Sequence, residues 1–432
     1  MDASDVWYHL FPLGFLEAEE VNPDPGGEPG GVTHRLPALV GWLDYLVDLG
    51  VTGVLLGPVF ESETHGYDTV DPLRIDRRLG DEADLVALIE ECHRRSLVVA
   101  LDAVLHHVGR RHPYFQDVLA RGEQSAYCDW FEIDFSQPGH DGFAYANFEG
   151  HGQLVKLNHA NPLVLDWAVN FASYWIERGV DAYRLDAAYA LPTPFVSAFA
   201  NRVRGLRSDL FLLGEVIHGD YVRTAKRARL SSVTQYELWK AVWSSLNDGN
   251  FFELAHAIQR HTGFCERFRP WTFLSNHDTT HIATQLEDSR HCGHALALLM
   301  TLPGVPAVYA GDEQSARGRK YDREGGDAEV RRPPPQKPNE LSGEQLASYQ
   351  QHQQLIAARR QRPWLATGEV NVVELQNRQM TYEVLSGDAR AFVALSTDDA
   401  PTTVQLPPDL LHVAGNVDTH LPPRGWGVWA SD

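Results

Sequence analysis

The chain has 432 residues, enough for one large catalytic core and a small additional domain. Hydrophobic residues make up 43% and charged residues 22%, which excludes a mostly disordered chain. The formal net charge of −21 repels nucleic acids and anionic membranes, so we expect neither as a partner. No run of about 18 apolar residues could span a bilayer and no basic leader precedes the first apolar run, so we expect a cytoplasmic protein.

Short apolar runs alternate along the chain with longer segments of helical periodicity, as in a parallel sheet covered by helices. The eight apolar runs span residues 6–11, 53–57, 97–105, 182–185, 210–214, 233–235, 271–274 and 305–309. The predicted helices span residues 36–49, 82–95, 162–178, 195–204, 221–228, 251–260 and 282–302. Eight apolar runs that alternate with helical segments favour an α/β fold of the (β/α)8 TIM barrel type over an open doubly wound sheet.

Two segments interrupt this alternation of apolar runs and predicted helices. Residues 108–158 are rich in His, Gly and aromatic residues and are too long for an ordinary loop, so we expect an inserted B domain after strand three. From about residue 363, alternating segments at 369–375, 380–385 and 391–395 predict a C-terminal antiparallel β-sandwich domain. We therefore assign residues 1–107 and 159–362 to the barrel, 108–158 to the insertion and 363–432 to the last domain.

Polar side chains follow the carboxyl ends of four predicted strands, where the loops of a parallel barrel build active sites. They are Asp102, His106 and His107; Arg184 and Asp186; Glu215; and His277 and Asp278. Arg184 and Asp186 are two positions apart on a strand and share a face, so the arginine can keep Asp186 ionised. Two carboxylates are the machinery of glycoside hydrolysis, in which one attacks the anomeric carbon and the other protonates the leaving oxygen. A lone carboxylate at a strand end is more often a cap or a structural ion pair, so the prediction depends on the whole set.

These segments resemble the four signature regions of the α-amylase family, glycoside hydrolase family 13. The matching segments are DAVLHH (102–107), DAYRLDAA (181–188), LLGEVIH (212–218) and LSNHD (274–278), with HGYD (65–68) as a further match. Within the family, KLN (156–158), DWF (129–131) and GEVIH (214–218) are similar to the cyclomaltodextrinase, neopullulanase and maltogenic amylase group. Strand one begins at residue 6, so we expect the N-terminal β-domain of that group to be absent.

The resemblance implies a role for each matching residue. Asp186 would be the nucleophile, Glu215 the acid/base and Asp278 the stabiliser of the transition state. Tyr67 would stack on the sugar at the cleaved bond, and Arg184 would orient Asp186. The other expected substrate-binding residues are Asp68, His107, His218 and His277, with Asp327 and Arg331 gripping the next sugar along.

The chain also departs from the family pattern. His106 stands where the family usually has an Asn that often binds calcium, and imidazole suits a hard cation poorly. A barrel metallohydrolase would use a His-x-His pair at the end of strand one, where this chain has only His9. We therefore expect no metal and no cofactor. Tyr189 and Ala190 occupy positions where α-amylases often carry Lys-His to hold the leaving sugar.

The sequence thus predicts a retaining α-glycosidase that hydrolyses α-1,4-glucosidic bonds in small linear or cyclic maltooligosaccharides inside the cell, with an oligomeric state left open. One alternative is a transglycosylase, or glucanotransferase, on the same α-glucan substrates. A second is a hydrolase of a mixed-linkage cyclic maltosyl saccharide. A third is a non-catalytic barrel that binds a sugar or a partner protein, which would predict the loss of at least one carboxylate. All three carboxylates, Asp186, Glu215 and Asp278, are present.

Overall fold

The computed structural model describes residues 5–27, 31–323, 325–332, 337 and 340–431. Eight strands of this part of the chain form a parallel sheet of order β13-β12-β11-β5-β2-β1-β15-β14. Their bounds are β1 Trp7–Leu10, β2 Gly53–Leu56, β5 Val98–Ala103, β11 Ala182–Leu185, β12 Phe211–Gly214, β13 Ser232–Val233, β14 Trp271–Phe273 and β15 Val305–Tyr309. A parallel bridge between Thr234 and Trp271 joins the two ends of this order, so the sheet closes into the predicted TIM barrel.

The barrel strands are apolar runs that are buried on both faces. Every residue of β1, β2, β11, β12 and β15 is buried. Such a strand is stable where one face packs inside the barrel and the other lies under a helix. All eight runs predicted from the sequence are therefore confirmed as strands, although β13 is shorter and begins one residue earlier than expected.

The helices follow the strands in alternation. The main helices are α2 Pro37–Leu49, α3 Glu82–Arg94, α5 Pro162–Ile176, α6 Thr193–Leu206, α7 Tyr221–Ala228, α8 Tyr236–Asp248, α9 Phe251–Cys265, α11 Cys292–Thr301 and α12 Gly343–Gln361. Of these, α3, α5, α7, α8 and α9 begin with side-chain caps. At the start of α5, the Asn161 side chain accepts a hydrogen bond from the N–H of Leu163, and Pro162 occupies the first helical position. Helix α8 begins after Gln235, whose side-chain oxygen accepts from two backbone N–H groups.

The single helix predicted over residues 282–302 is wrong. The chain instead forms a short helix α10 Ile282–Gln285, a 3-10 turn Ser289–His291 and then α11. Leu286 is extended with φ −80° and ψ 130°, which ends α10, and the Asp288 side chain accepts from the N–H of Arg290. The apolar pattern continues across this break, so periodicity alone could not reveal it.

The chain divides into two compact units, each described here by itself. Unit 2 contains residues 11–43 and 55–231. It includes the hairpin of β3 Phe60–Ser62 with β4 Thr69–Ile75 and the expected insertion after β5. The insertion comprises helix α4 Pro113–Arg121, a sheet of β6 His107–Gly109, β10 His151–Lys156 and β9 Asn147–Phe148, and the pair β7 Ile133–Asp134 with β8 Ala144–Tyr145.

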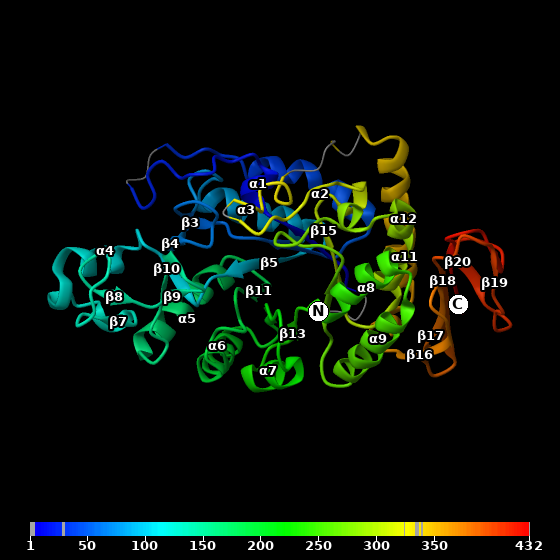
Figure 1. Cartoon of the computed structure of the whole chain (residues 1–432). Helices are drawn as coiled ribbons and strands as arrows, with labels where there is room; N and C mark the ends of the chain where they lie inside the picture. Colours follow the sequence, from blue (N-terminus) through cyan, green and yellow to red (C-terminus); the bar gives the residue numbers. More distant parts are fainter. Residues whose placement is uncertain (1–4, 28–30, 324, 333–336, 338–339, 432) are drawn as a thin grey trace. The chain divides into compact units, whose positions relative to one another are not determined.

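Unit 1 contains the described residues of 1–10, 44–54 and 232–432. Its C-terminal part is an antiparallel sheet of order β16-β17-β18-β22-β20, drawn in orange and red in Figure 1. These strands are β16 Glu369–Leu375, β17 Gln379–Ser386, β18 Ala389–Ser396, β22 Trp426–Ala430 and β20 Leu411–Gly415. A second pair is β19 Thr402–Thr403 with β21 His420–Leu421. Leu421 and Val404, the residue after β19, pack in one apolar cluster with Phe392, Ala394 and Trp429 of the larger sheet. The three strands predicted here are confirmed, whereas the exact domain boundaries at 107, 158 and 362 stay predictions.

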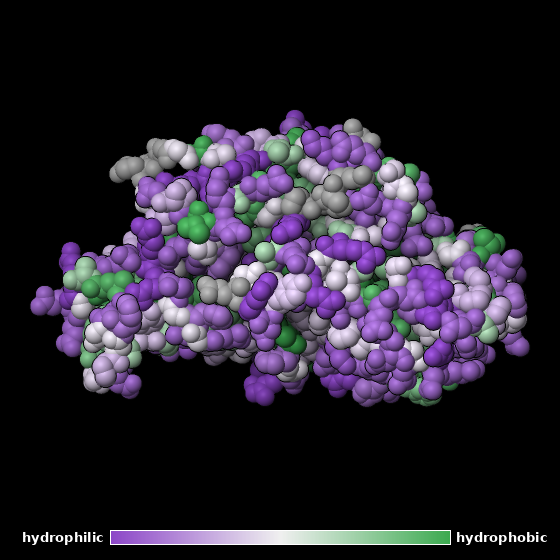
Figure 2. Space-filling view, turned by 45° about the horizontal axis from the view of Figure 1, so that its top comes forward, coloured by the Kyte–Doolittle hydropathy of each residue, from purple (hydrophilic) through white to green (hydrophobic). Residues whose placement is uncertain are grey.

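Hydrophilic side chains predominate on the face of the molecule in Figure 2, and hydrophobic ones gather only in small groups. Among the described residues, every helix is too short or too polar to cross a membrane.

Candidate active site

One buried arginine in unit 2 contacts three carboxylates. Arg184 lies on β11, and its side chain is only 4% exposed. Its Nη1 donates to Asp102 Oδ2 at 2.6 Å and to Asp186 Oδ1 at 3.3 Å. Its Nη2 lies 2.8 Å from Glu215 Oε1. The structure therefore brings together the predicted nucleophile, the predicted acid/base and the arginine expected to orient Asp186.

The charges of this cluster act strongly on one another. Burial alone would lower the pKa of Arg184, but the charges of Asp102 and Glu215 raise it well above its usual range. One fixed cation thus faces three buried carboxylate groups. A buried carboxylate left without such a partner would be strongly destabilising, so Arg184 is needed for this arrangement to exist.

Glu215 is held by the backbone after β11 as well as by Arg184. Its Oε2 accepts a hydrogen bond of 2.9 Å from the N–H of Ala187, the residue after Asp186. Ala187 has a φ of 46°, a left-handed conformation that costs a non-glycine residue on the order of 1 kcal/mol. The turn after Asp186 is therefore shaped so that its backbone N–H points at Glu215.

Tyr67 and Asp68 lie in the turn between β3 and β4. The Tyr67 hydroxyl donates to Asp102 Oδ2 at 3.2 Å, and the Arg184 guanidinium carbon lies 6.0 Å from the centre of the Tyr67 ring. Asp68 is buried and accepts from the Thr64 hydroxyl at 2.6 Å. Gly66 has a φ of 92°, and a side chain there would approach Pro58 to 2.5 Å, so this turn requires glycine. Tyr67 thus belongs to the Arg184 cluster, while its stacking on a sugar stays a prediction.

His106 and His107 are buried next to each other after β5. Burial lowers the pKa of His106 to about 4 and that of His107 to about 3, so both rings are neutral near pH 7. Both rings pack against Phe148 of the insertion, with centroid distances of 5.2 and 5.0 Å. His107 Nε2 is buried and has no hydrogen-bond partner among the described residues.

His218 is exposed and lies on the loop after β12. Its ring is 5.5 Å from the ring of Tyr189, edge to face. The Tyr189 hydroxyl donates to Glu149 Oε1 at 2.7 Å, and its N–H donates to the Glu215 carbonyl at 3.1 Å. Glu149 belongs to the insertion and was not predicted, because nothing in the sequence relates its turn to the loop that follows Asp186.

A second group of predicted residues lies in unit 1, after β14. Asp278 Oδ2 is 2.9 Å from His277 Nε2, and its Oδ1 is 2.7 Å from Arg331 Nη2. Arg331 also pairs with Asp327 at 2.8 Å and donates from Nε to the His277 carbonyl at 3.1 Å. Lys320, which the sequence did not single out, forms an ion pair with Asp327. The structure thus brings together His277, Asp278, Asp327 and Arg331, while their position in one site with Asp186 and Glu215 stays a prediction.

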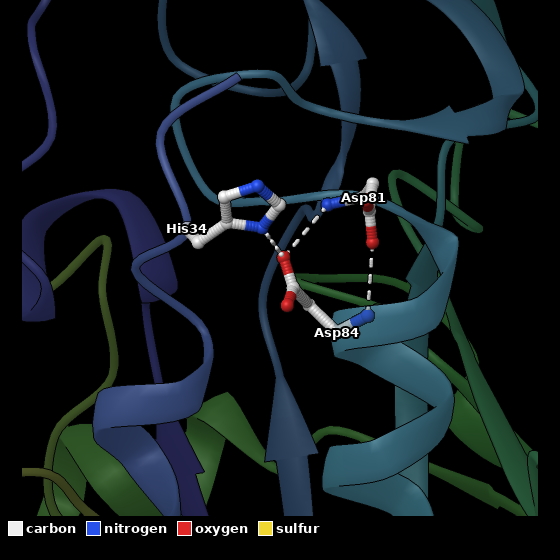
Figure 3. Close-up of side chains that lie close together, drawn as sticks. All are labelled: His34, Asp81 and Asp84. Carbon is white, nitrogen blue, oxygen red and sulfur yellow. Dashed lines mark hydrogen bonds and ion pairs between the residues drawn. The ribbon is translucent and has the colours of Figure 1, made fainter.

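Figure 3 shows a different group, His34, Asp81 and Asp84, whose side-chain ligand atoms all lie within 4.8 Å of one another. Asp84 Oδ2 is 2.5 Å from His34 Nδ1 and accepts from the Asp81 N–H at 3.1 Å. The Asp81 side chain in turn accepts from the Asp84 N–H at 3.0 Å. The two bonds between Asp81 and Asp84 form the capping box that begins helix α3, and His34 pairs with the same Asp84 side chain, so the start of the helix accounts for the group without an ion.

The closed parallel barrel thus carries two neighbouring carboxylates at the carboxyl ends of its strands, the pair of groups that glycoside hydrolysis requires. A family model described as the catalytic domain of α-amylase matches residues 18–337. The chain therefore belongs to the α-amylase family of glycoside hydrolases. Within that family it resembles the cyclomaltodextrinase and maltogenic amylase group, as the sequence motifs indicated.

Two curated relatives illustrate the similarity. A cyclomaltodextrinase from Geobacillus thermopakistaniensis strain MAS1 is 30% identical over 430 residues, covering 94% of this chain and 70% of the relative. An intracellular maltogenic amylase from Bacillus subtilis is 32% identical over 336 residues, covering 72% of this chain and 55% of the relative. The chain therefore aligns with between about half and about two thirds of the length of these enzymes.

Among solved structures, a similar one is the ligand-free cyclic α-maltosyl-(1→6)-maltose hydrolase from Arthrobacter globiformis. The two structures superpose with a TM-score of 0.84 at 27% sequence identity, covering 100% of this chain and 99% of that one. The same enzyme has also been solved in complex with cyclic α-maltosyl-(1→6)-maltose.

Proposed function

We propose that this protein is a retaining α-glycosidase that hydrolyses α-1,4-glucosidic bonds in short linear or cyclic maltooligosaccharides. The main support is that one buried arginine, Arg184, holds the carboxylates of Asp186 and Glu215 at the ends of two neighbouring strands. The names of the cyclomaltodextrinase and maltogenic amylase relatives support the substrate class. The name of the Bacillus subtilis relative also supports a location inside the cell.

The proposed reaction has two steps. First, the Asp186 carboxylate attacks the anomeric carbon while protonated Glu215 gives its proton to the leaving glycosidic oxygen, and the C–O bond breaks. Then Glu215 takes a proton from water, and the water oxygen displaces Asp186 from the anomeric carbon with net retention. The excess of carboxylates over cations around Arg184 favours the positive charge that develops on the sugar ring between these steps.

The remaining residues receive supporting roles. Asp278, the third carboxylate, stabilises the transition state. His277 and the neutral His107 hold hydroxyls of the sugar at the cleaved bond. The unpaired, buried Nε2 of His107 supports this role, because a buried polar atom without a partner among the described residues is suited to a ligand hydroxyl. The other residues assigned to substrate binding are Tyr67, Asp68, His218, Asp327 and Arg331.

A cyclic sugar with mixed α-1,4 and α-1,6 linkages is a second candidate substrate. It is favoured by the superposition on the Arthrobacter globiformis enzyme, which extends along the whole of both chains. A transglycosylase would use the same carboxylates, and only the acceptor, water or sugar, would differ.

The test is a panel of purified sugars incubated with the protein, with products resolved over time. The panel contains maltotriose, γ-cyclodextrin, pullulan and cyclic α-maltosyl-(1→6)-maltose, with sucrose and trehalose as controls. We expect cleavage of at least one of the first four, with the α-anomer released first in proton NMR spectra. Release of the β-anomer, or cleavage of none of the four, would overturn the proposal. Longer or relinked products at high substrate concentration would identify a transglycosylase.

A further inference from the structure

A row of alternating charges leads away from Asp278 within unit 1. Arg331 Nη2 lies 2.7 Å from Asp278 Oδ1 and 2.8 Å from Asp327 Oδ2, so two carboxylates share one guanidinium nitrogen. The second oxygen of Asp327, Oδ1, forms an ion pair with Lys320 Nζ. The signs therefore alternate from Lys320 through Asp327 and Arg331 to Asp278.

Arg331 and His277 both contact the Asp278 carboxylate, Arg331 at Oδ1 and His277 at Oδ2. Besides the bond to the Asp278 carboxylate, Arg331 donates from Nε to the carbonyl oxygen of His277 at 3.1 Å. One side chain thus holds both the backbone and the carboxylate of the loop after β14. A displacement of about 1 Å at a catalytic carboxylate can lower the rate by on the order of a hundredfold.

Asp327 competes with Asp278 for the same nitrogen of Arg331. We infer that Lys320 is a positioning residue for Asp278, which acts by neutralising Asp327 and so leaving Arg331 to hold the Asp278 carboxylate. This inference rests on the proposed function, because it gives Lys320 a role only through the part assigned to Asp278. Without the ammonium group, the full negative charge of Asp327 draws Arg331 away from Asp278.

The backbone around Lys320 is fixed to the loop that carries Asp278. The Lys320 N–H donates to the Thr280 hydroxyl at 3.0 Å, two residues after Asp278. Nearby, the His281 N–H donates to the Gly318 carbonyl at 3.1 Å. The Lys320 side chain is 36% exposed, so its substitution removes a charge and leaves the core of the protein intact. Because these contacts fix the backbone of Lys320, they hold its ammonium group close to Asp327.

A double-mutant cycle tests this inference. The proteins are the wild type, Lys320→Met, Asp327→Asn and the double variant, assayed on whichever sugar of the panel the wild type cleaves fastest. We expect Lys320→Met to lower kcat/KM roughly threefold to fivefold, as expected for a partly exposed charge interaction. In the Asp327→Asn background, where no second carboxylate competes for Arg331, the same substitution should change kcat/KM by less than about twofold. Lys320→Arg, which keeps the charge, should retain most of the activity.

Lys240→Met is the matched control, because Lys240 forms a comparable ion pair with Glu253 between α8 and α9 of the same unit. We expect it to have the activity of the wild type, and we expect all variants to have similar thermal unfolding midpoints. The inference would be overturned if Lys320→Met lowered kcat/KM equally in both backgrounds or not at all. It would also be overturned if Lys320→Arg lost as much activity as Lys320→Met. In each of these cases turnover by the wild type would still uphold the proposed function. A wild type that cleaves none of the sugars would overturn both.

Discussion

Glu313 provides a prediction about pH and stability that can be worked out from its surroundings. This residue follows β15 and is 0% exposed. Its Oε1 accepts hydrogen bonds of 2.9 Å from the hydroxyls of Tyr8 and Tyr45, and its Oε2 accepts one of 2.9 Å from the Gly311 N–H. None of these donors is cationic, and burial raises the pKa of Glu313 from an ordinary value of 4.5 to about 7.

The sign of the effect follows from proton linkage. Between pH 4.5 and about 7 the folded protein holds a proton on Glu313 that the unfolded chain has released. The contribution of this group to stability is therefore greatest below pH 4.5 and falls as the pH rises through the folded pKa. The difference between the two pKa values corresponds to about 3 kcal/mol in the free energy of unfolding.

The assay compares the wild type with Glu313→Gln by urea and thermal unfolding from pH 4.5 to pH 8. The amide does not titrate, so the stability of the wild type relative to the variant should fall by about 3 kcal/mol across this range. For a cooperative transition of the whole chain, this fall equals about 3 °C in the difference between the two Tm values. Glu90→Gln on the exposed face of α3 is the control and should parallel the wild type at every pH. Parallel curves for Glu313→Gln as well would refute the reasoning, because Glu313 would then ionise alike in both states.

Three further predictions concern the candidate site. Asp186→Asn should lower turnover at least about a thousandfold while the far-ultraviolet circular dichroism stays unchanged, and substantial residual activity would contradict its role as nucleophile. Arg184→Met should lower the free energy of unfolding by roughly 3–5 kcal/mol, because it leaves three buried carboxylates without their cation, and a Tm equal to that of the wild type would contradict this account. EDTA should change the hydrolysis rate by less than about twofold, since the family resemblance implies that His106 stands in place of an oxygen ligand of the kind calcium prefers, and a large loss reversed by calcium would contradict this expectation.

The barrel could be predicted from the sequence because its strands are buried on both faces and therefore appear as continuous apolar runs. Helix α8 was missed because its segment YELWKAVWSSLND is rich in aromatic residues and serine, which have only modest helix propensity. The break between α10 and α11 depends on Leu286 and on the cap formed by Asp288, which are local features that the apolar pattern does not report.

The Arg184 cluster could also be predicted, since Arg184, Asp186 and Glu215 lie on or directly after identifiable strands, whereas Asp327 and Arg331 were expected only from the family resemblance. Arg184 and Asp186 were expected to interact because they are two positions apart on β11. Lys320 and Glu149 could not be found in this way, because both belong to irregular segments outside the barrel strands. Their partners, Asp327 and Tyr189, are defined by tertiary packing, so only the structure identifies them.

The pairing of β1 with β15 has a consequence for how the protein is made. Trp7 on β1 lies opposite Ala307 on β15, so the two halves of this strand pair are about 300 residues apart in the chain. At ordinary translation rates of 5–20 residues per second, the ribosome needs roughly 15–60 s to supply that neighbour. During this interval one edge of the apolar strand β1 stays unpaired and can associate with the wrong partner, so β1 completes its hydrogen bonds long after it has emerged from the ribosome.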